Sequence, residues 1–137
     1  MRIKDKIREI ERYSTELFSA IPADLEFENY KRDFRIKAIC ERYFEKIIES
    51  VVDLAFLIIR DKKFKIPEGD SEAFDILADG SVISAQLAQK LKEAKGMRNI
   101  ITHEYGKIDD EIVFHSITEE LEKDIREFIE SIKKALK

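Results

Sequence analysis

The scarcity of residues that let a chain turn sharply is the feature that most constrains this fold. Only four glycines and two prolines occur in 137 residues, whereas these two residue types make up about 12% of an average protein. Sheet proteins need many tight turns, and such turns depend on glycine and proline. We therefore predict an all-α protein.

Hydrophobic residues recur at helical spacing along most of the chain. Apolar positions every three or four residues predict a first helix over about residues 3–20, which ends before Pro22. A second apolar series runs from Phe34 to Ile58 and covers almost every face in its second half. This second helix should therefore be long, lie at the centre of the fold and end at the segment 65–69.

Two further helices are expected in the middle of the chain. Asp70 or Ser71 would cap a short helix that stops at Gly80. A longer helix should begin at about Ser84 and continue beyond residue 100.

The last segment predicts a terminal helix. Ser116 and Glu119 stand at capping-box spacing before an apolar series, so we expect the helix to start there. The connections are short enough for antiparallel neighbours, and no linker or repeat interrupts the chain. Residues 1–137 should form a single domain, an up-and-down helical bundle with a four-helix core and a short extra helix.

Composition argues against several classes of function. The net charge of −4 disfavours nonspecific coating of nucleic acid, which requires clustered Lys and Arg. Cys40 is the only cysteine and no signal stretch opens the sequence, so we expect a cytoplasmic protein without disulfides. The longest apolar run, residues 51–59, is far shorter than the roughly 20 residues of a membrane span, so no membrane role is expected. With only His103 and His115 as imidazoles and no glycine-rich phosphate loop, we expect neither a metal nor a cofactor.

A polar cluster interrupts the apolar face of the helix that follows Ser84. Positions spaced by four and three residues form one seam: Leu87, Leu91, Ala94, Arg98, Ile101 and Tyr105. Arg98 thus occupies a core position, where a guanidinium needs an anion or hydrogen-bond acceptors. For an isolated arginine, a snorkelling side chain or an ion pair with a neighbouring helix is the ordinary explanation. Asn99, His103 and Tyr105 accompany it, however, and together these groups are suited to handling a phosphate.

The same region is basic within an acidic protein. Residues 85–107 contain five Lys or Arg and two Glu, so this segment carries +3 and the remainder of the chain −7. Such a segment predicts an anion-binding surface, although ordinary variation along a charged helix is the alternative.

The order Arg-Asn-x3-His-x-Tyr over residues 98–105, followed by Gly-Lys-Ile-Asp, resembles the HepT-like branch of the HEPN superfamily. The charged first helix, the long apolar second helix and the segments 74–80 and 110–113 are also similar, so the resemblance covers nearly the whole chain. It implies an all-helical HEPN-like homodimer that acts as a metal-independent endoribonuclease, the toxin of a toxin–antitoxin pair. It also implies a MntA-like minimal nucleotidyltransferase antitoxin as partner, which silences the toxin by adenylylating Tyr105.

The residues fit this chemistry on physical grounds. Cleaving RNA without a metal requires activation of the ribose 2′-hydroxyl, stabilisation of charge on phosphorus and protonation of the leaving 5′-oxygen. A histidine side chain can exchange protons near neutral pH and an arginine can hold two phosphate oxygens, so His103 and Arg98 are both candidate catalytic residues. Asn99, four residues before His103, is a candidate supporting residue that would orient the imidazole. A phenol near a helix end can pack its ring and expose its oxygen, which is compatible with modification of Tyr105.

One geometric conflict has two solutions. His103 lies roughly 140° around the helix from Arg98, so a straight helix points the two side chains apart. Either the helix loosens before His103, or the site is assembled between subunits, and we favour a two-fold dimer with this helix at its interface.

Two rival interpretations of the chain remain. A non-catalytic helical partner could bind a nucleotide and present it to a nucleotidyltransferase subunit, and the acidic net charge suits such a protein partner. A purely structural bundle is the other.

Overall fold

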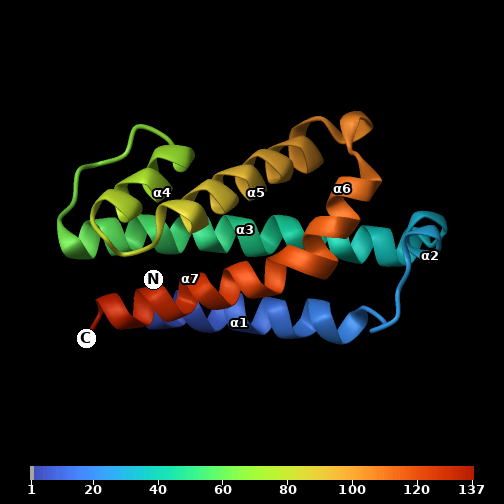
Figure 1. Ribbon diagram of the computed structural model, residues 1–137, viewed down its shortest axis with the longest axis horizontal. Coiled ribbons are helices and arrows are strands. Elements are labelled where there is room, and N and C mark those ends of the chain that lie inside the picture. The colour runs from blue at the N-terminus through green and yellow to red at the C-terminus, as the bar shows by residue number, and fades with distance from the viewer. Residues whose placement is uncertain (1) are drawn as a thin grey trace.

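The computed structural model describes residues 2–137, which fold into helices joined by short loops, with no β-strand in that range (Figure 1). The elements are α1 (Ile3–Ala20), α2 (Phe27–Arg32), α3 (Phe34–Lys62), α4 (Asp70–Asp79), α5 (Ala85–His103), a 3-10 turn (Tyr105–Lys107), α6 (Asp110–His115), a π-helical turn (Ser116–Glu120) and α7 (Leu121–Ala135). The predicted all-α class is confirmed. None of the helices within residues 2–137 has the length and apolarity to cross a membrane.

The long helix α3 organises the bundle, as predicted. In Figure 1 it runs through the middle of the molecule, with α4 and α5 on one side and α1 with the end of α7 on the other. Its side chains are buried on several faces, including Phe44, Ile47 and Leu54. Phe74 of α4 and Phe128 of α7 meet edge to face with ring centroids 6.4 Å apart. One continuous apolar core therefore holds all the long helices.

The start of α4 differs from the prediction, whereas its end and the start of α5 agree. Gly69, and neither Asp70 nor Ser71, is the N-cap of α4, and no side chain caps it. Ser84 caps α5 as expected, accepting a hydrogen bond from the Leu87 amide at 3.0 Å. Gly80 ends α4, and a Cβ atom there would lie 2.7 Å from the Phe64 ring, so only glycine fits without displacing that ring.

The terminal segment is longer than predicted. The helix begins with α6 at Asp110, where the Asp109 side chain accepts hydrogen bonds from two amides. Ser116 and Glu119 form no capping box, because they lie in the π-helical turn that joins α6 to α7. The short α2 and α6 were also missed, and they are held by Phe114, whose ring packs against Phe27 and Tyr30.

A buried cation fastens α1 to α3. Lys6 Nζ donates to Glu9 at 2.8 Å and to Asp53 at 3.3 Å, and Ser50 Oγ donates to the same Glu9 oxygen at 2.7 Å. Burial of the ammonium acts to lower the pKa of Lys6, but the hydrogen bonds to Glu9 and Asp53 outweigh it and raise the pKa. The hydrogen bond from Lys6 lowers the pKa of Glu9 below its ordinary value of 4.5.

This contact makes part of the stability depend on acid pH. Because the pKa of Glu9 is lower in the folded chain, its stabilising contribution is complete above about pH 4.5 and is lost as the pH falls through the folded pKa. We predict that Glu9→Gln lowers the free energy of unfolding by about 1–2 kcal/mol at pH 7. Urea denaturation should show this difference shrinking between pH 5 and pH 3. Glu68→Gln, at an exposed position in the loop before α4, is the control, and a constant difference for Glu9→Gln across this range would contradict the assignment.

Candidate active site

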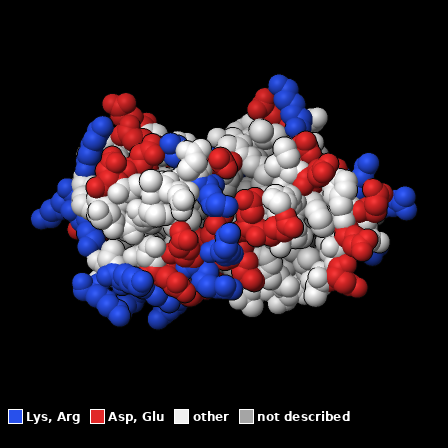
Figure 2. All heavy atoms as spheres, viewed as in Figure 1, with Lys and Arg blue, Asp and Glu red and all other residues white. Residues whose placement is uncertain are grey.

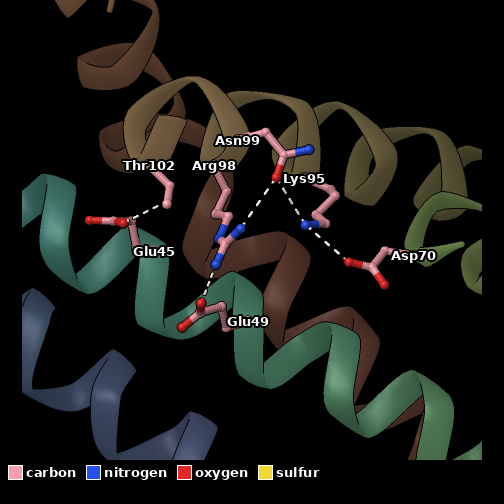
Figure 3. Close-up of polar contacts among 7 residues, drawn as sticks. All are labelled: Glu45, Glu49, Asp70, Lys95, Arg98, Asn99 and Thr102. Carbon is pink, nitrogen blue, oxygen red and sulfur yellow. Dashed lines mark hydrogen bonds and ion pairs between the residues drawn. The ribbon is translucent and has the colours of Figure 1, made fainter. Parts of the chain in front are cut away.

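Arg98 points from α5 toward α3 and is largely enclosed. Its side chain is 13% exposed, and its guanidinium forms an ion pair with Glu49 of α3 (Figure 3). A second guanidinium nitrogen donates to Asn99 Oδ1 at 3.3 Å, and Nε is buried without a hydrogen-bond partner among residues 2–137. The charge of a guanidinium at a core position is thus satisfied by a neighbouring helix.

Lys95 extends this polar cluster toward α4. Its ammonium is buried and lies 3.0 Å from an Asp70 carboxylate oxygen and 3.0 Å from Asn99 Oδ1 (Figure 3). The Asn99 oxygen therefore accepts from Arg98 and Lys95 together. This oxygen is therefore not available to His103, and no hydrogen bond between the Asn99 amide and the imidazole is found within residues 2–137. The role of Asn99 as a supporting residue stays a prediction.

A row of three carboxylates on α3 faces the end of α5. Glutamates at four-residue spacing lie on one side of a helix, and each of these three meets a different side chain. The contacts are Arg98 with Glu49, Thr102 Oγ1 with Glu45 at 2.7 Å, and Tyr105 Oη with Glu41 at 2.7 Å. We call Glu41, Glu45 and Glu49 the acidic row. It fixes the position of α5 along α3.

His103 lies apart from Arg98 in this chain. The helix α5 stays α-helical through His103 and ends there, so it does not loosen before the histidine. Five residues correspond to about 140° around the axis. His103 is exposed, and no hydrogen bond to its imidazole is found within residues 2–137, whereas Arg98 faces α3. One chain therefore presents the two candidate catalytic side chains on different faces of α5.

Tyr105 lies in the 3-10 turn that follows α5, and 63% of its surface is exposed. It leaves the buried seam, but its hydroxyl turns back and donates to the buried Glu41. This hydrogen bond, together with the negative charge of Glu41, raises the pKa of Tyr105 above its ordinary value. The structure thus combines an accessible phenol with a fixed hydroxyl orientation.

The basic segment, which was expected to form an anion-binding surface, is electrostatically compensated within residues 2–137. All five of its Lys and Arg residues pair with a carboxylate: Lys90 with Glu120, Lys92 with Asp75, Lys95 with Asp70, Arg98 with Glu49, and Lys107 with Glu104. On the face in Figure 2, basic and acidic side chains lie intermingled across the middle of the molecule. Carboxylates of α3, α4 and the π-helical turn account for most of this compensation.

Comparison with known proteins identifies relatives over most of this chain. A family model described as "Ribonuclease HepT-like" matches residues 3–132. The chain is 32% identical over 104 residues to the mRNA nuclease HepT of Shewanella oneidensis, covering 76% of this chain and 77% of the relative. It is 28% identical over 136 residues to a putative RNase of Archaeoglobus fulgidus, covering 99% and 96%.

Solved structures share the whole architecture. The tri-AMPylated HEPN toxin of Shewanella oneidensis, solved in complex with an MNT antitoxin, superposes with a TM-score of 0.86 at 29% identity, covering 98% of this chain and 99% of that chain. A toxin–antitoxin structure with AMP-PNP gives 0.85 at 28% identity, covering 96% of this chain and 97% of that chain. The fold is that of the HEPN class of helical proteins. Within that class, the chain belongs to the HepT-like ribonuclease family.

Proposed function

We propose that this protein is an RNA-cleaving toxin of a toxin–antitoxin pair and that Arg98 and His103 are its catalytic residues. Membership of the HepT-like ribonuclease family supports the reaction class. The observation that carries the assignment of residues is the preorganised Arg98, which Asn99 and Glu49 hold in place on α5, five residues before an exposed histidine.

The proposed mechanism uses an exchange of anions at Arg98. The Glu49 side chain is 50% exposed, so its carboxylate can move into solvent when an RNA phosphate takes its place beside the guanidinium. His103 then accepts or supplies the proton as the 2′-oxygen bonds to phosphorus and the bond to the 5′-oxygen breaks. The products of this step are a 2′,3′-cyclic phosphate and a 5′-hydroxyl.

We further propose that the working form is a homodimer with α5 at its interface. A two-fold axis beside α5 would bring the outward-facing His103 of both copies to one cleft. The outer face of α5 has room for a second copy: a Cβ at Gly96 would meet no atom within 4 Å, and Figure 2 shows a hollow over the middle of α5. Gly96, Ile100 and His103 share this outer face by their spacing.

The control mechanism we propose is adenylylation of Tyr105 by a MntA-like minimal nucleotidyltransferase in the cytoplasm. The solved relative is described as tri-AMPylated and bound to an MNT antitoxin, which supports this partner class. Tyr105 and Arg98 contact carboxylates eight residues apart on α3, a separation of about 12 Å along the helix. Nucleotide attached to Tyr105 would introduce a phosphate and a base close to the RNA site.

Substitution of Arg98 and His103 tests the proposed catalysis. Arg98→Ala and His103→Ala should each reduce cleavage of labelled RNA by at least about 100-fold, because each removes a group that acts on the phosphodiester. His115→Ala, at the other exposed histidine, should cleave normally. Wild-type cleavage should survive EDTA and leave cyclic-phosphate ends.

Circular dichroism confirms folding of these variants, and Arg98→Lys retains the charge if Arg98→Ala unfolds. Wild-type rates for His103→Ala, or strict dependence on added Mg²⁺, would contradict the assignment. Nucleotide binding without any RNA cleavage by the wild type would favour the alternative, a non-catalytic nucleotide-binding partner of a nucleotidyltransferase.

Substitution of Gly96 tests the proposed dimer. Sedimentation velocity should show the wild type as a dimer at micromolar concentration, and Gly96→Arg as a monomer that has lost RNA cleavage. The monomer itself should tolerate this change, because Gly96 faces open space and arginine is the better helix former by roughly 1 kcal/mol. Ser19→Arg, at an exposed position on α1, should remain dimeric and active. A dimeric, fully active Gly96→Arg protein would exclude this interface.

Substitution of Tyr105 tests the proposed control of the nuclease by adenylylation. Incubation with the cognate nucleotidyltransferase and ATP should add adenylate mass to the wild type and to Tyr43→Phe, but not to Tyr105→Phe at that residue. Intact mass spectrometry and peptide mapping measure the addition. The modified wild type should no longer cleave RNA, since the new phosphate competes for Arg98. Full nuclease activity in completely modified protein would remove Tyr105 from this role.

A further inference from the structure

An exposed hydroxyl and a buried carboxylate meet at the end of α5. Tyr105 Oη lies 2.7 Å from Glu41 Oε1, and the ring of Tyr105 faces solvent. Glu41 is only 5% exposed, one of the few charged residues in the interior. The phenolic hydrogen therefore points at a carboxylate that the fold holds in one place.

No other tyrosine offers this combination within the described residues. Tyr30 is buried, and its hydroxyl has no hydrogen-bond partner there. Tyr43 donates to Glu16 at 3.1 Å, but Glu16 is an exposed side chain free to move in solvent. Within residues 2–137, no hydrogen bond to the hydroxyl of Tyr13 is found. Among the tyrosines of this range, only Tyr105 joins an accessible oxygen to a fixed acceptor.

The surroundings of Tyr105 oppose a preformed phenolate. The groups that act on it are Glu41 and Glu45 of α3, Asp110 of α6 and Tyr30 of α2, and none of them is a cation. Two cations from neighbouring elements are themselves bound to carboxylates: Lys37 to Asp110 at 3.0 Å and Lys107 to Glu104 at 3.2 Å. The hydrogen bond to Glu41 and these negative charges raise the pKa of Tyr105. At neutral pH the phenol keeps its proton until a reaction removes it.

We propose that Glu41 is the proton acceptor when a nucleotide is transferred to Tyr105, an inference that rests on the proposed modification of that residue. Tyr105 Oη bonds to the α-phosphorus of ATP, and the bond from that phosphorus to the oxygen bridging toward the β-phosphate breaks, releasing pyrophosphate. The phenolic proton passes to Glu41 Oε1. It moves as the oxygen–phosphorus bond forms, because the phenol becomes strongly acidic at that point and its hydrogen bond already leads to the carboxylate.

The same contact selects the residue that is modified. A fixed hydroxyl presents its lone pairs in one direction, so the attacking oxygen is aligned before the nucleotidyltransferase binds. The toxin thereby contributes a group of its own to the reaction that silences it.

The test is the rate of adenylyl transfer by the cognate nucleotidyltransferase, with ATP and Mg²⁺, between pH 6 and pH 9. Glu41→Gln keeps an oxygen that can accept the hydrogen bond but cannot take the proton, and should slow transfer about 100-fold at pH 7. Its rate should then rise with pH as the phenolate becomes populated, whereas the wild-type rate changes little. Glu16→Gln, which alters the other tyrosine–glutamate pair, should behave as wild type.

A second readout is independent of the partner enzyme. Ultraviolet difference titration against Tyr105→Phe reports the ionisation of this phenol, and its pKa should fall in Glu41→Gln because a negative charge is removed. Circular dichroism and thermal unfolding of the unmodified variant show whether it folds. If Glu41→Gln unfolds, Glu41→Asp replaces it in the test. We expect this variant to be adenylylated at a rate between those of the wild type and of a chain without an acceptor, with the wild-type pH profile.

The outcomes separate this inference from the function on which it rests. Transfer to Glu41→Gln at the wild-type rate, with the wild-type pH profile, overturns the role of Glu41 and leaves Tyr105 as the modified residue. A wild type that is never modified at Tyr105 overturns both. Slowed, pH-dependent transfer together with a lowered phenol pKa establishes Glu41 as the acceptor.

Discussion

The contact between α5 and the acidic row on α3 is the constraint on which the rest of the site depends. A guanidinium cannot be enclosed between helices without acceptors, so Arg98 has to lie where Glu49 and Asn99 reach it. Once that pair is formed, the four-residue period of α3 dictates where the hydroxyls of Thr102 and Tyr105 find their carboxylates. The register of α5 along α3, and with it the direction in which His103 leaves the helix, follows from this one alignment.

Compensation of charge explains how a protein with net charge −4 can hold a cationic site. Lys95 is buried against Asp70 and Asn99, which lowers the cost of enclosing its ammonium. The positive charge is therefore focused on one replaceable contact, Glu49, rather than spread over a basic surface. Such an arrangement favours a phosphate held at one point over general attraction to nucleic acid.

Much of the fold could be predicted from hydrophobic periodicity, because the periodic pattern of a long amphipathic helix begins and ends with the helix. The first helix was predicted over residues 3–20 and is observed there, and the apolar series from Phe34 correctly predicted the buried central helix. The short helices α2 and α6 escaped prediction because six residues are too few to show a period, and tertiary contacts of Phe114 hold them. Ser116 and Glu119 have the spacing of a capping box, but the helix is already formed before them and continues through the π-helical turn. The sequence alone does not show this continuation.

The sequence singled out the candidate residues on and after α5, but neither their contacts nor their partners on α3. The seam on α5 indicated that Arg98 lies inside, which is confirmed, but sequence spacing placed Asn99 beside His103 when its oxygen is taken by Arg98 and Lys95. The acidic row went unrecognised because carboxylates on a charged helix usually only solvate it. Its four-residue spacing on the most buried helix of the chain was the available signal, and the partners on α5 could only come from the tertiary structure.

The ion pair of Arg98 with Glu49 also affects how RNA binding responds to ionic strength. Each phosphate contact normally releases condensed counterions from the nucleic acid, and the count of such contacts sets how steeply affinity falls with salt. At Arg98, salt weakens the internal carboxylate contact as well as the phosphate contact that replaces it, so the two effects oppose each other. On the proposed mechanism, this arginine therefore adds less to the salt dependence of binding than a freely solvated arginine would. The number of phosphate contacts calculated from the salt dependence of binding would then be smaller than the number of cationic side chains that contact the RNA.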